Sequence, residues 1–147
     1  MSGVFRFPVD VRFGQCDPAG IAYFPRFFDW FHQAMEAWFG EALGQPYHAV
    51  LRRHGFPAVH TTCDYQAPCR FGDRVVVELR VGELGRASLR LDYRVVGPRG
   101  DVRARATTRV VQIGTDPTLV DHLQSVPITG DLRAAIEAFG VGPGAGA

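Results

Sequence analysis

The chain has 147 residues, a formal net charge of +1 at pH 7, 46% hydrophobic residues and 21% charged residues. This length and composition are typical of one globular domain with one hydrophobic core, and they argue against wholesale disorder. The nearly balanced charge argues against a nucleic-acid partner, which usually requires a basic face. No apolar run reaches the roughly 20 residues of a membrane-spanning helix, and the first residues lack the pattern of a signal peptide, so we expect no membrane association.

The counts of cysteine and lysine narrow the possible chemistry further. Three cysteines, an odd number, indicate free thiols in a reducing compartment, so we expect the protein in the cytoplasm. The sequence contains no lysine, which excludes Schiff-base chemistry. No zinc-ligand spacing, Walker A loop, Gly-x-Ser-x-Gly elbow or Gly-x-Gly-x-x-Gly motif occurs, so we expect neither a metal nor a bound cofactor.

The first segment of the chain predicts an edge strand followed by a loop. Residues 5–13 alternate apolar and polar side chains, which is the pattern of a half-buried strand. Pro8 falls on the polar side and has no backbone donor, so we place this strand at a sheet edge or a bulge. Residues 14–20 contain two glycines and a proline and are typical of a loop.

The most informative pattern predicts a helix over 23–39. Its apolar side chains cover roughly 200° of the helix surface, which is wider than the stripe of an ordinary surface helix. We therefore expect a curved sheet to wrap this helix. Pro25 suits the first helical turn and Gly40 suits the end of the helix. The polar side chains on the opposite face are Arg26, Asp29, His32, Gln33 and Glu36.

Four strands and two short helices are predicted after this helix. The strands span 58–67, 74–81, 88–96 and 102–113, and the short helices lie near 45–54 and 131–139. Glycine-containing links at 82–85 and 97–100 indicate hairpins between antiparallel neighbours. One helix over one face of an antiparallel sheet is an α+β arrangement. We expect a single domain over 1–140 and a disordered tail over 141–147.

Asp17 is the leading candidate for a catalytic residue. It lies just before the predicted apolar helix, whose first N–H groups and positive dipole end can polarise a substrate carbonyl. The alternative is a turn or cap residue, a common role for aspartate before a helix. The neighbouring Cys16 is a rival nucleophile, but the sequence pairs no histidine with it, and a small buried thiol is the preferred interpretation.

Residues 13–30, Phe-Gly-Gln-Cys-Asp-Pro-Ala-Gly-Ile-Ala-Tyr-Phe-Pro-Arg-Phe-Phe-Asp-Trp, resemble the signature of the 4-hydroxybenzoyl-CoA thioesterase family of hotdog-fold proteins. The stretch Gln66-Ala67-Pro68…Gly72-Asp73, which leads into long strands, is similar too, and the resemblance covers roughly 5–115. It implies a hotdog fold, in which an antiparallel β-sheet wraps a long central helix. It also implies hydrolysis of an acyl-CoA thioester to a carboxylate and free CoA, by a homodimer or homotetramer with active sites at subunit interfaces.

The same resemblance assigns roles to the loop and the helix start. Asp17 would be the catalytic carboxylate, either as nucleophile or as general base for water. The backbone N–H near Phe24, after Tyr23, would polarise the thioester carbonyl, and Gly20 would let the backbone approach it closely. Related hotdog thioesterases can use a helix carboxylate, so Glu36 is a secondary candidate, although a solvated or ion-paired role is favoured.

The aromatic helix favours an acyl group of the benzoyl or 4-hydroxybenzoyl type. Trp30 and His32 are candidates to contact it, with His32 reading a ring substituent; core packing or an interface position are the alternatives. The loop arginines Arg70 and Arg86 are candidates to bind the CoA phosphates. The strand arginines are expected on exposed faces or at intersubunit contacts; they are Arg90, Arg94, Arg103, Arg105 and Arg109.

Other activities are alternatives to aryl-CoA hydrolysis. The substrate could instead be a short aliphatic acyl-CoA or an acyl-carrier protein. A hotdog hydratase would need a histidine in the loop 14–20, which has none. In a non-catalytic acyl-CoA binding module, Asp17 would be dispensable.

Overall fold

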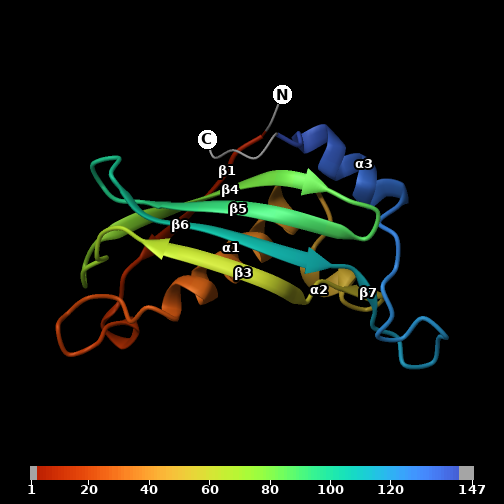
Figure 1. Ribbon diagram of the computed structural model, residues 1–147, viewed down its shortest axis with the longest axis horizontal. Helices are drawn as coiled ribbons and strands as arrows, with labels where there is room; N and C mark the ends of the chain where they lie inside the picture. Colours follow the sequence, from red (N-terminus) through yellow and green to blue (C-terminus); the bar gives the residue numbers. More distant parts are fainter. Residues whose placement is uncertain (1–2, 143–147) are drawn as a thin grey trace.

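The computed structural model describes residues 3–142, and its centre is a five-stranded antiparallel sheet crossed on one face by a long helix (Figure 1). The strands lie in the order β1-β4-β5-β6-β3, so β1 and β3 are the edges. Their bounds are β1 Phe5–Asp10, β3 Ala58–Tyr65, β4 Arg74–Leu84, β5 Ser88–Val96 and β6 Val102–Val111. The other elements are η1 Phe13–Gln15, α1 Arg26–Glu41, α2 Tyr47–Val50, β2 His54–Gly55, β7 Ile113–Gly114 and α3 Gly130–Phe139. The predicted α+β arrangement is confirmed.

Helix α1 buries a broad, mainly aromatic stripe against the sheet. Its buried side chains are Phe27, Trp30, Phe31, Ala34, Met35, Trp38 and Phe39. The facing rows of β4 and β5 are buried as well: Val75, Val77, Leu79, Val81, Leu89, Leu91, Tyr93 and Val95. All five polar residues predicted for the opposite helix face are exposed. Removal of this apolar surface from water is the main force that holds the helix on the sheet.

Helix α1 begins three residues later than the predicted helix 23–39, because Tyr23 is held outside it. The N–H of Tyr23 donates to the carbonyl of Gln15 at 2.9 Å, and Pro25 then caps the helix. At its other end the helix passes the expected stop at Gly40 by one residue. No helix in the part of the chain that the structure describes is both long and apolar enough to cross a lipid bilayer.

The predicted strands are present, with small changes at their ends. β1 is an edge strand, as Pro8 indicated, but it ends at Asp10 because the next residues fold into the turn η1. β4 runs to Leu84, beyond the predicted end at 81, since a bulge between Val81 and Glu83 keeps it paired with β5. β4, β5 and β6 are antiparallel neighbours as predicted.

The sheet face opposite α1 carries paired charges. Glu78, which is 8% exposed, lies 2.7 Å from the Arg94 guanidinium and 3.5 Å from those of Arg6 and Arg80. Burial raises the pKa of the Glu78 carboxyl, but the three guanidinium groups lower it by more, so its pKa lies below the ordinary value. These arginines are therefore satisfied within one chain by acidic partners.

The chain returns to the sheet after α3. Val141 forms a parallel bridge with Val81, and the N–H of Gly142 donates to the carbonyl of Val81 at 2.9 Å. The prediction of a disordered tail is therefore wrong for 141–142, where pairing with the backbone of β4 orders the chain. The rest of that predicted tail, 143–147, lies outside the described residues.

Arg103 is not an exposed strand residue, contrary to the prediction, because its side chain is only 13% exposed. Its guanidinium donates to the carbonyl of Pro68 at 2.7 Å and to Asp73 Oδ2 at 2.9 Å. The backbone N–H of Arg70 donates to the same carboxylate oxygen. This N–H and the Arg103 guanidinium hold the pKa of Asp73 below its ordinary value. Arg103 thereby fastens the segment 66–73 to β6.

We expect Asp73→Asn to lower the free energy of unfolding by about 1–3 kcal/mol at neutral pH, because it removes a charged acceptor from two hydrogen bonds. Since the folded-state pKa of Asp73 is lowered, its stabilisation is present above the ordinary aspartate pKa and is lost as the pH falls through the folded-state pKa. Denaturant titrations of both proteins across this range measure the difference. Asp64→Asn, an exposed carboxylate on β3, is the matched control. Equal losses in the two variants, or a loss that persists in acid, would contradict the assignment.

Candidate active site

The loop that carries Asp17 folds back on itself as a small hairpin. Cys16 and Ala22 form an antiparallel bridge, and the N–H of Asp17 donates to the carbonyl of Ile21 at 2.9 Å. The N–H of Gly20 donates to the carbonyl of Asp17 at 2.9 Å and closes the turn. Gly20 has a φ of +77°, a conformation that favours glycine. The turn geometry alone therefore accounts for glycine at this position.

One oxygen of the Asp17 carboxylate shapes the turn and the other does not. Oδ1 accepts a hydrogen bond from the N–H of Ala19 at 2.9 Å, which is the arrangement of an Asx turn. Within residues 3–142, Oδ2 accepts no hydrogen bond from the chain. The side chain is half-buried at the surface of the hairpin. Asp17 thus has the turn role that was considered as the alternative, and it keeps an oxygen that can react.

The backbone N–H of Phe24 has no acceptor in the part of the chain that the structure describes. The adjacent amides are used, since Tyr23 donates to Gln15 and Arg26 donates to Tyr23, while Pro25 has no N–H. The Phe24 amide precedes the first turn of α1, where helical N–H groups carry partial positive charge. An unpaired amide in this position can donate to an oxygen that gains negative charge during a reaction.

A cavity of about 290 Å³ opens beside this amide. Its lining residues are Ile21, Ala22, Phe24, Phe27, Tyr65, Gln66, Ala67, Pro68 and Cys69. The Tyr65 ring meets the rings of Phe24 and Phe27 edge-on, at centroid distances of 6.1 and 5.1 Å. Aromatic walls of this kind suit a planar apolar group. Asp17 is not among the residues that line this cavity.

The segment 66–73, which Arg103 holds against β6, is hydrogen-bonded to the hairpin that carries Asp17. The N–H of Ala22 donates to the carbonyl of Cys69 at 2.7 Å, and the N–H of Phe71 donates to the carbonyl of Gly20 at 3.0 Å. Arg70 lies between these contacts with an exposed side chain, and it forms an antiparallel bridge with Ile21 of the hairpin. Burial raises the pKa of the Cys69 thiol to about 11, which keeps this thiol protonated.

Arg86 lies far from this site within one chain. It is exposed in the turn between β4 and β5, at the opposite end of the sheet from the segment 66–73 (Figure 1). Arg70 and Arg86, both predicted to bind the CoA phosphates, therefore do not lie together in a single chain. Arg70 precedes the long strand β4, and Arg86 follows it.

The two residues expected to contact an acyl group lie in different environments. Trp30 is 0% exposed and packs in the core, so the structure does not place it at a surface that a ligand could reach. His32 is exposed and lines a cavity of about 230 Å³ between α1 and the β3–β6 edge. Thr61 and Thr108, whose hydroxyls lie 2.9 Å apart, line the same cavity. Its apolar lining residues are Phe28, Phe31, Met35, Phe56, Pro57, Ala58, Tyr93 and Val110.

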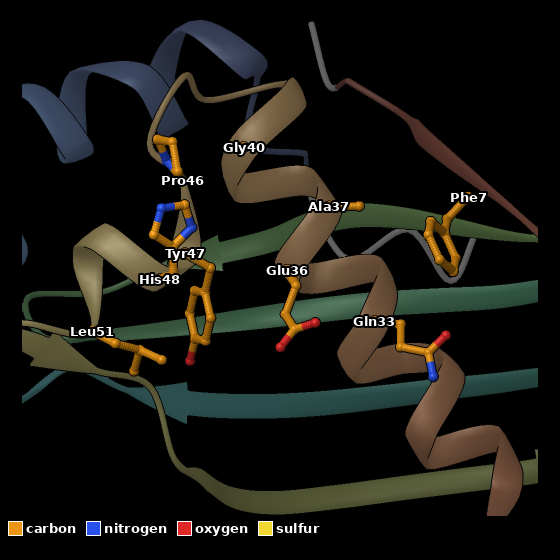
Figure 2. A pocket seen from close by; sticks show the side chains of 9 residues that line it. All are labelled: Phe7, Gln33, Glu36, Ala37, Gly40, Pro46, Tyr47, His48 and Leu51. Atoms are coloured by element: carbon orange, nitrogen blue, oxygen red, sulfur yellow. The ribbon is translucent and has the colours of Figure 1, made fainter.

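Glu36 faces a different space on the outward side of α1. Figure 2 shows it beside Gln33 and opposite Tyr47 and His48 in an open cleft of about 550 Å³. Its carboxylate oxygen Oε1 lies 3.4 Å from Nε2 of His32. No residue of the loop 14–20 lines this cleft. The environment of Glu36 matches the ion-paired role that was favoured for it.

Cys16 has no histidine beside it in the described part of the chain. Its thiol donates instead to the carbonyl of Arg12, at 3.4 Å, within the turn that follows β1. Across residues 3–142, no three His, Cys, Asp or Glu side chains lie together in a group that could hold a metal ion. Asp17 is the carboxylate of the loop before α1, whereas Asp29, on the helix, lies 3.4 Å from the Arg26 guanidinium.

Two residues that support the site were not identified from the sequence. Tyr65 lies 41 positions from Phe24, and its hydroxyl donates to the Phe24 carbonyl at 3.0 Å. Arg103 lies on the same strand as Arg105 and Arg109, and the alternation of side chains along this strand did not indicate that Arg103 is buried. A register for β3 against β6 would have been needed to place both residues.

The chain is similar to several known proteins. A family model of the Thioesterase-like superfamily matches residues 11–136. A 1,4-dihydroxy-2-naphthoyl-CoA hydrolase from Synechococcus elongatus is 38% identical over 94 residues, which are 62% of this chain and 68% of that protein. A 1,4-dihydroxy-2-naphthoyl-CoA thioesterase from Synechocystis has a TM-score of 0.79 at 26% identity and covers 91% of this chain and 96% of its own. A gentisyl-coenzyme A thioesterase has a TM-score of 0.76 at 29% identity, with 90% and 98% covered.

The matched region contains both the Asp17 hairpin and the central helix. These similar proteins are hydrolases of CoA thioesters, and they share the antiparallel sheet wrapped around one helix. The expected hotdog fold and the resemblance to its acyl-CoA thioesterases are confirmed. The chain belongs to the Thioesterase-like superfamily, the family of hotdog-fold thioester hydrolases.

Proposed function

We propose that this protein hydrolyses the thioester of an aromatic acyl-CoA of the benzoyl or hydroxybenzoyl type, giving a carboxylate and free CoA. The observation that carries the proposal is the arrangement around the start of α1. A carboxylate with a free oxygen, Asp17, and an amide without an acceptor in the described residues, that of Phe24, lie on one short hairpin-to-helix segment, and Phe24 lines an aromatic cavity.

The two groups divide the chemistry of the reaction between them. The Phe24 amide and the positive end of α1 stabilise the negative charge that develops on the carbonyl oxygen during attack. Asp17 supplies the attack by one of two routes. Its carboxylate adds to the carbonyl carbon and forms a mixed anhydride that water then hydrolyses, or it takes a proton from the attacking water. In both routes the CoA thiolate leaves.

The substrate class is inferred from the cavities and from the similar proteins. The cavity beside Phe24 is walled by aromatic rings, and the cavity beside His32 combines such rings with imidazole and hydroxyl groups. The similar proteins carry the names of dihydroxynaphthoyl-CoA and gentisyl-CoA hydrolases, whose acyl groups are hydroxylated aromatic rings. Short aliphatic acyl-CoA and acyl-carrier-protein substrates are the second candidates, because the apolar walls would accept them too.

Phosphate binding is assigned to Arg70 within one chain. Its exposed guanidinium extends from the segment that supports the Asp17 hairpin, so it can reach the phosphates of a CoA whose sulfur lies beside Asp17. Arg86 would contribute to the same site only from another copy of the chain.

A second copy of the chain is expected along β3. This strand is a sheet edge, and all of its residues except Cys63 are exposed, including Val59 at 59%. An unpaired edge presents free N–H and C=O groups to another strand. Pairing of two β3 strands about a two-fold axis would continue the sheet and cover the cavity beside His32, which Ala58 and Thr61 of β3 line. The proposed assembly is therefore a homodimer, alone or within a tetramer.

We expect Asp17→Asn to lower kcat for benzoyl-CoA by about 10²–10⁴-fold, because an amide neither attacks a thioester nor accepts the proton of water. Binding of benzoyl-CoA should change little, since the isosteric side chain keeps its bond to Ala19. Release of free thiol and calorimetric binding measure the two effects. Cys16→Ser is the control and should keep most of the turnover. An Asp17→Asn protein that keeps most of its activity would remove Asp17 from the mechanism. A folded and inactive Cys16→Ser protein would instead favour Cys16 as the nucleophile.

We expect His32→Phe to lower the preference for 4-hydroxybenzoyl-CoA over benzoyl-CoA by roughly tenfold, because the ring hydroxyl loses one hydrogen-bond partner. The ratio of the two kcat/KM values measures this preference. His48→Phe, on α2 and outside the cavity, is the matched control. An unchanged ratio in the His32 variant would place the acyl group elsewhere.

We expect Val59→Lys to shift the protein toward the monomer, because a lysine on a strand edge opposes pairing with a second edge. Light scattering after size-exclusion chromatography measures the assembly. Val120→Lys, at a fully exposed valine outside β3, should leave the assembly unchanged. A monomeric wild-type protein would contradict the proposed dimer.

A further inference from the structure

Tyr65 connects two parts of the molecule that are far apart in sequence. It is the last residue of β3, and its hydroxyl donates to the carbonyl of Phe24 at 3.0 Å. The only other donor to this carbonyl in the described residues is the N–H of Phe27, at the longer distance of 3.3 Å. The hydrogen bond from the Tyr65 hydroxyl is thus the shorter of the two that the Phe24 carbonyl accepts.

The bond holds the residue whose amide is unpaired. Phe24 lies in the short link between the hairpin and α1, where Tyr23 is fixed by Gln15 and Pro25 is fixed by its ring. The N–H and C=O of one residue are joined through two backbone torsions. A carbonyl tied to the sheet therefore limits the directions in which the N–H of the same residue can point.

The ring of Tyr65 adds a second constraint on the same residue. It contacts the rings of Phe24 and Phe27 edge-on, and it forms part of the wall of the cavity beside the amide. Tyr65 is itself 44% exposed, so its contribution to core burial is smaller than that of a buried aromatic residue. Its contacts are concentrated on the start of α1.

We propose that Tyr65 is a positioning residue for the reaction: its hydroxyl holds the Phe24 backbone so that the Phe24 N–H points at the carbonyl oxygen of the bound thioester. This inference rests on the proposed function, and it adds the residue that fixes the polarising donor. Tyr65 itself does not touch the reacting atoms. Burial raises the pKa of Tyr65 to about 12, so the hydroxyl remains a donor at any pH at which the enzyme would be assayed.

The test uses Tyr65→Phe, which keeps the ring and removes only the donor. Since a displaced donor stabilises the transition state less well, we expect kcat for benzoyl-CoA to fall by about tenfold while KM changes by less than about twofold. Tyr47→Phe is the control, because it also removes a phenol hydroxyl, but Tyr47 lines the cleft of Glu36 and not the cavity lined by Phe24 and Tyr65. Its kcat should equal that of the wild type.

A spectroscopic measurement separates positioning from general destabilisation. Benzoyl-CoA labelled with ¹³C at the carbonyl is bound to Asp17→Asn protein, which should not hydrolyse it, and the infrared carbonyl stretch is recorded. We expect a shift to lower frequency from the Phe24 hydrogen bond, and a smaller shift when Tyr65→Phe is added. Both proteins should unfold at the same temperature.

The outcomes distinguish this inference from the function on which it rests. A wild-type protein that releases no CoA would overturn the proposed function itself. An active wild type whose kcat and carbonyl frequency are unaffected by Tyr65→Phe would overturn the positioning role alone. A loss of kcat that is matched by Tyr47→Phe would also overturn it, because the effect would then be that of any lost hydroxyl.

Discussion

The site depends on one backbone amide, that of Phe24, which finds no acceptor in the part of the chain that the structure describes. Every helix begins with N–H groups that lack an acceptor within the helix, and most proteins satisfy them with a cap. The N-cap of α1 is Pro25, which offers no side-chain acceptor, and the first three helical amides donate instead to the carbonyls of Tyr23, Phe24 and Pro25. The amide of Phe24 lies just before the N-cap and has no acceptor within residues 3–142. An amide left open in this way gives a fixed donor that needs no rearrangement during a reaction.

The surrounding structure keeps that amide and Asp17 in place through ordinary backbone pairing. The hairpin bridge between Cys16 and Ala22 sets the position of the carboxylate, and the segment 66–73 supports it from behind. Arg103 fastens that segment to β6. The reactive groups therefore lie on loops, while the strands and α1 supply the rigid frame to which those loops are bound.

Much of the fold could be predicted from residue patterns, because period-two alternation and a broad apolar helix stripe are local signals. β5 has the predicted bounds, and β4, β5 and β6 are the antiparallel neighbours that the glycine-containing links indicated. The ends of elements were less accurate where a tertiary hydrogen bond decided them. Tyr23 is held out of α1 by Gln15, a contact that no local pattern of the helix contains.

The candidate site was only partly predictable for the same reason. The unpaired amide and the turn at Gly20 follow from a local motif, whereas Tyr65 and Arg103 act across a register that the sequence did not define. Trp30 was misplaced because an aromatic residue at the edge of a wide stripe has the same pattern whether it meets a ligand or the core. Arg86 was grouped with Arg70 although a long strand separates them.

The most direct test of the account is a crystal structure with a CoA thioether in which a ketone replaces the thioester carbonyl. We expect the ketone oxygen to lie about 3 Å from the Phe24 nitrogen, and an Asp17 oxygen to lie roughly 3–3.5 Å from the ketone carbon or to share one water molecule with it. A ligand whose ketone lies away from the start of α1, with Asp17 turned to solvent, would contradict the central claim.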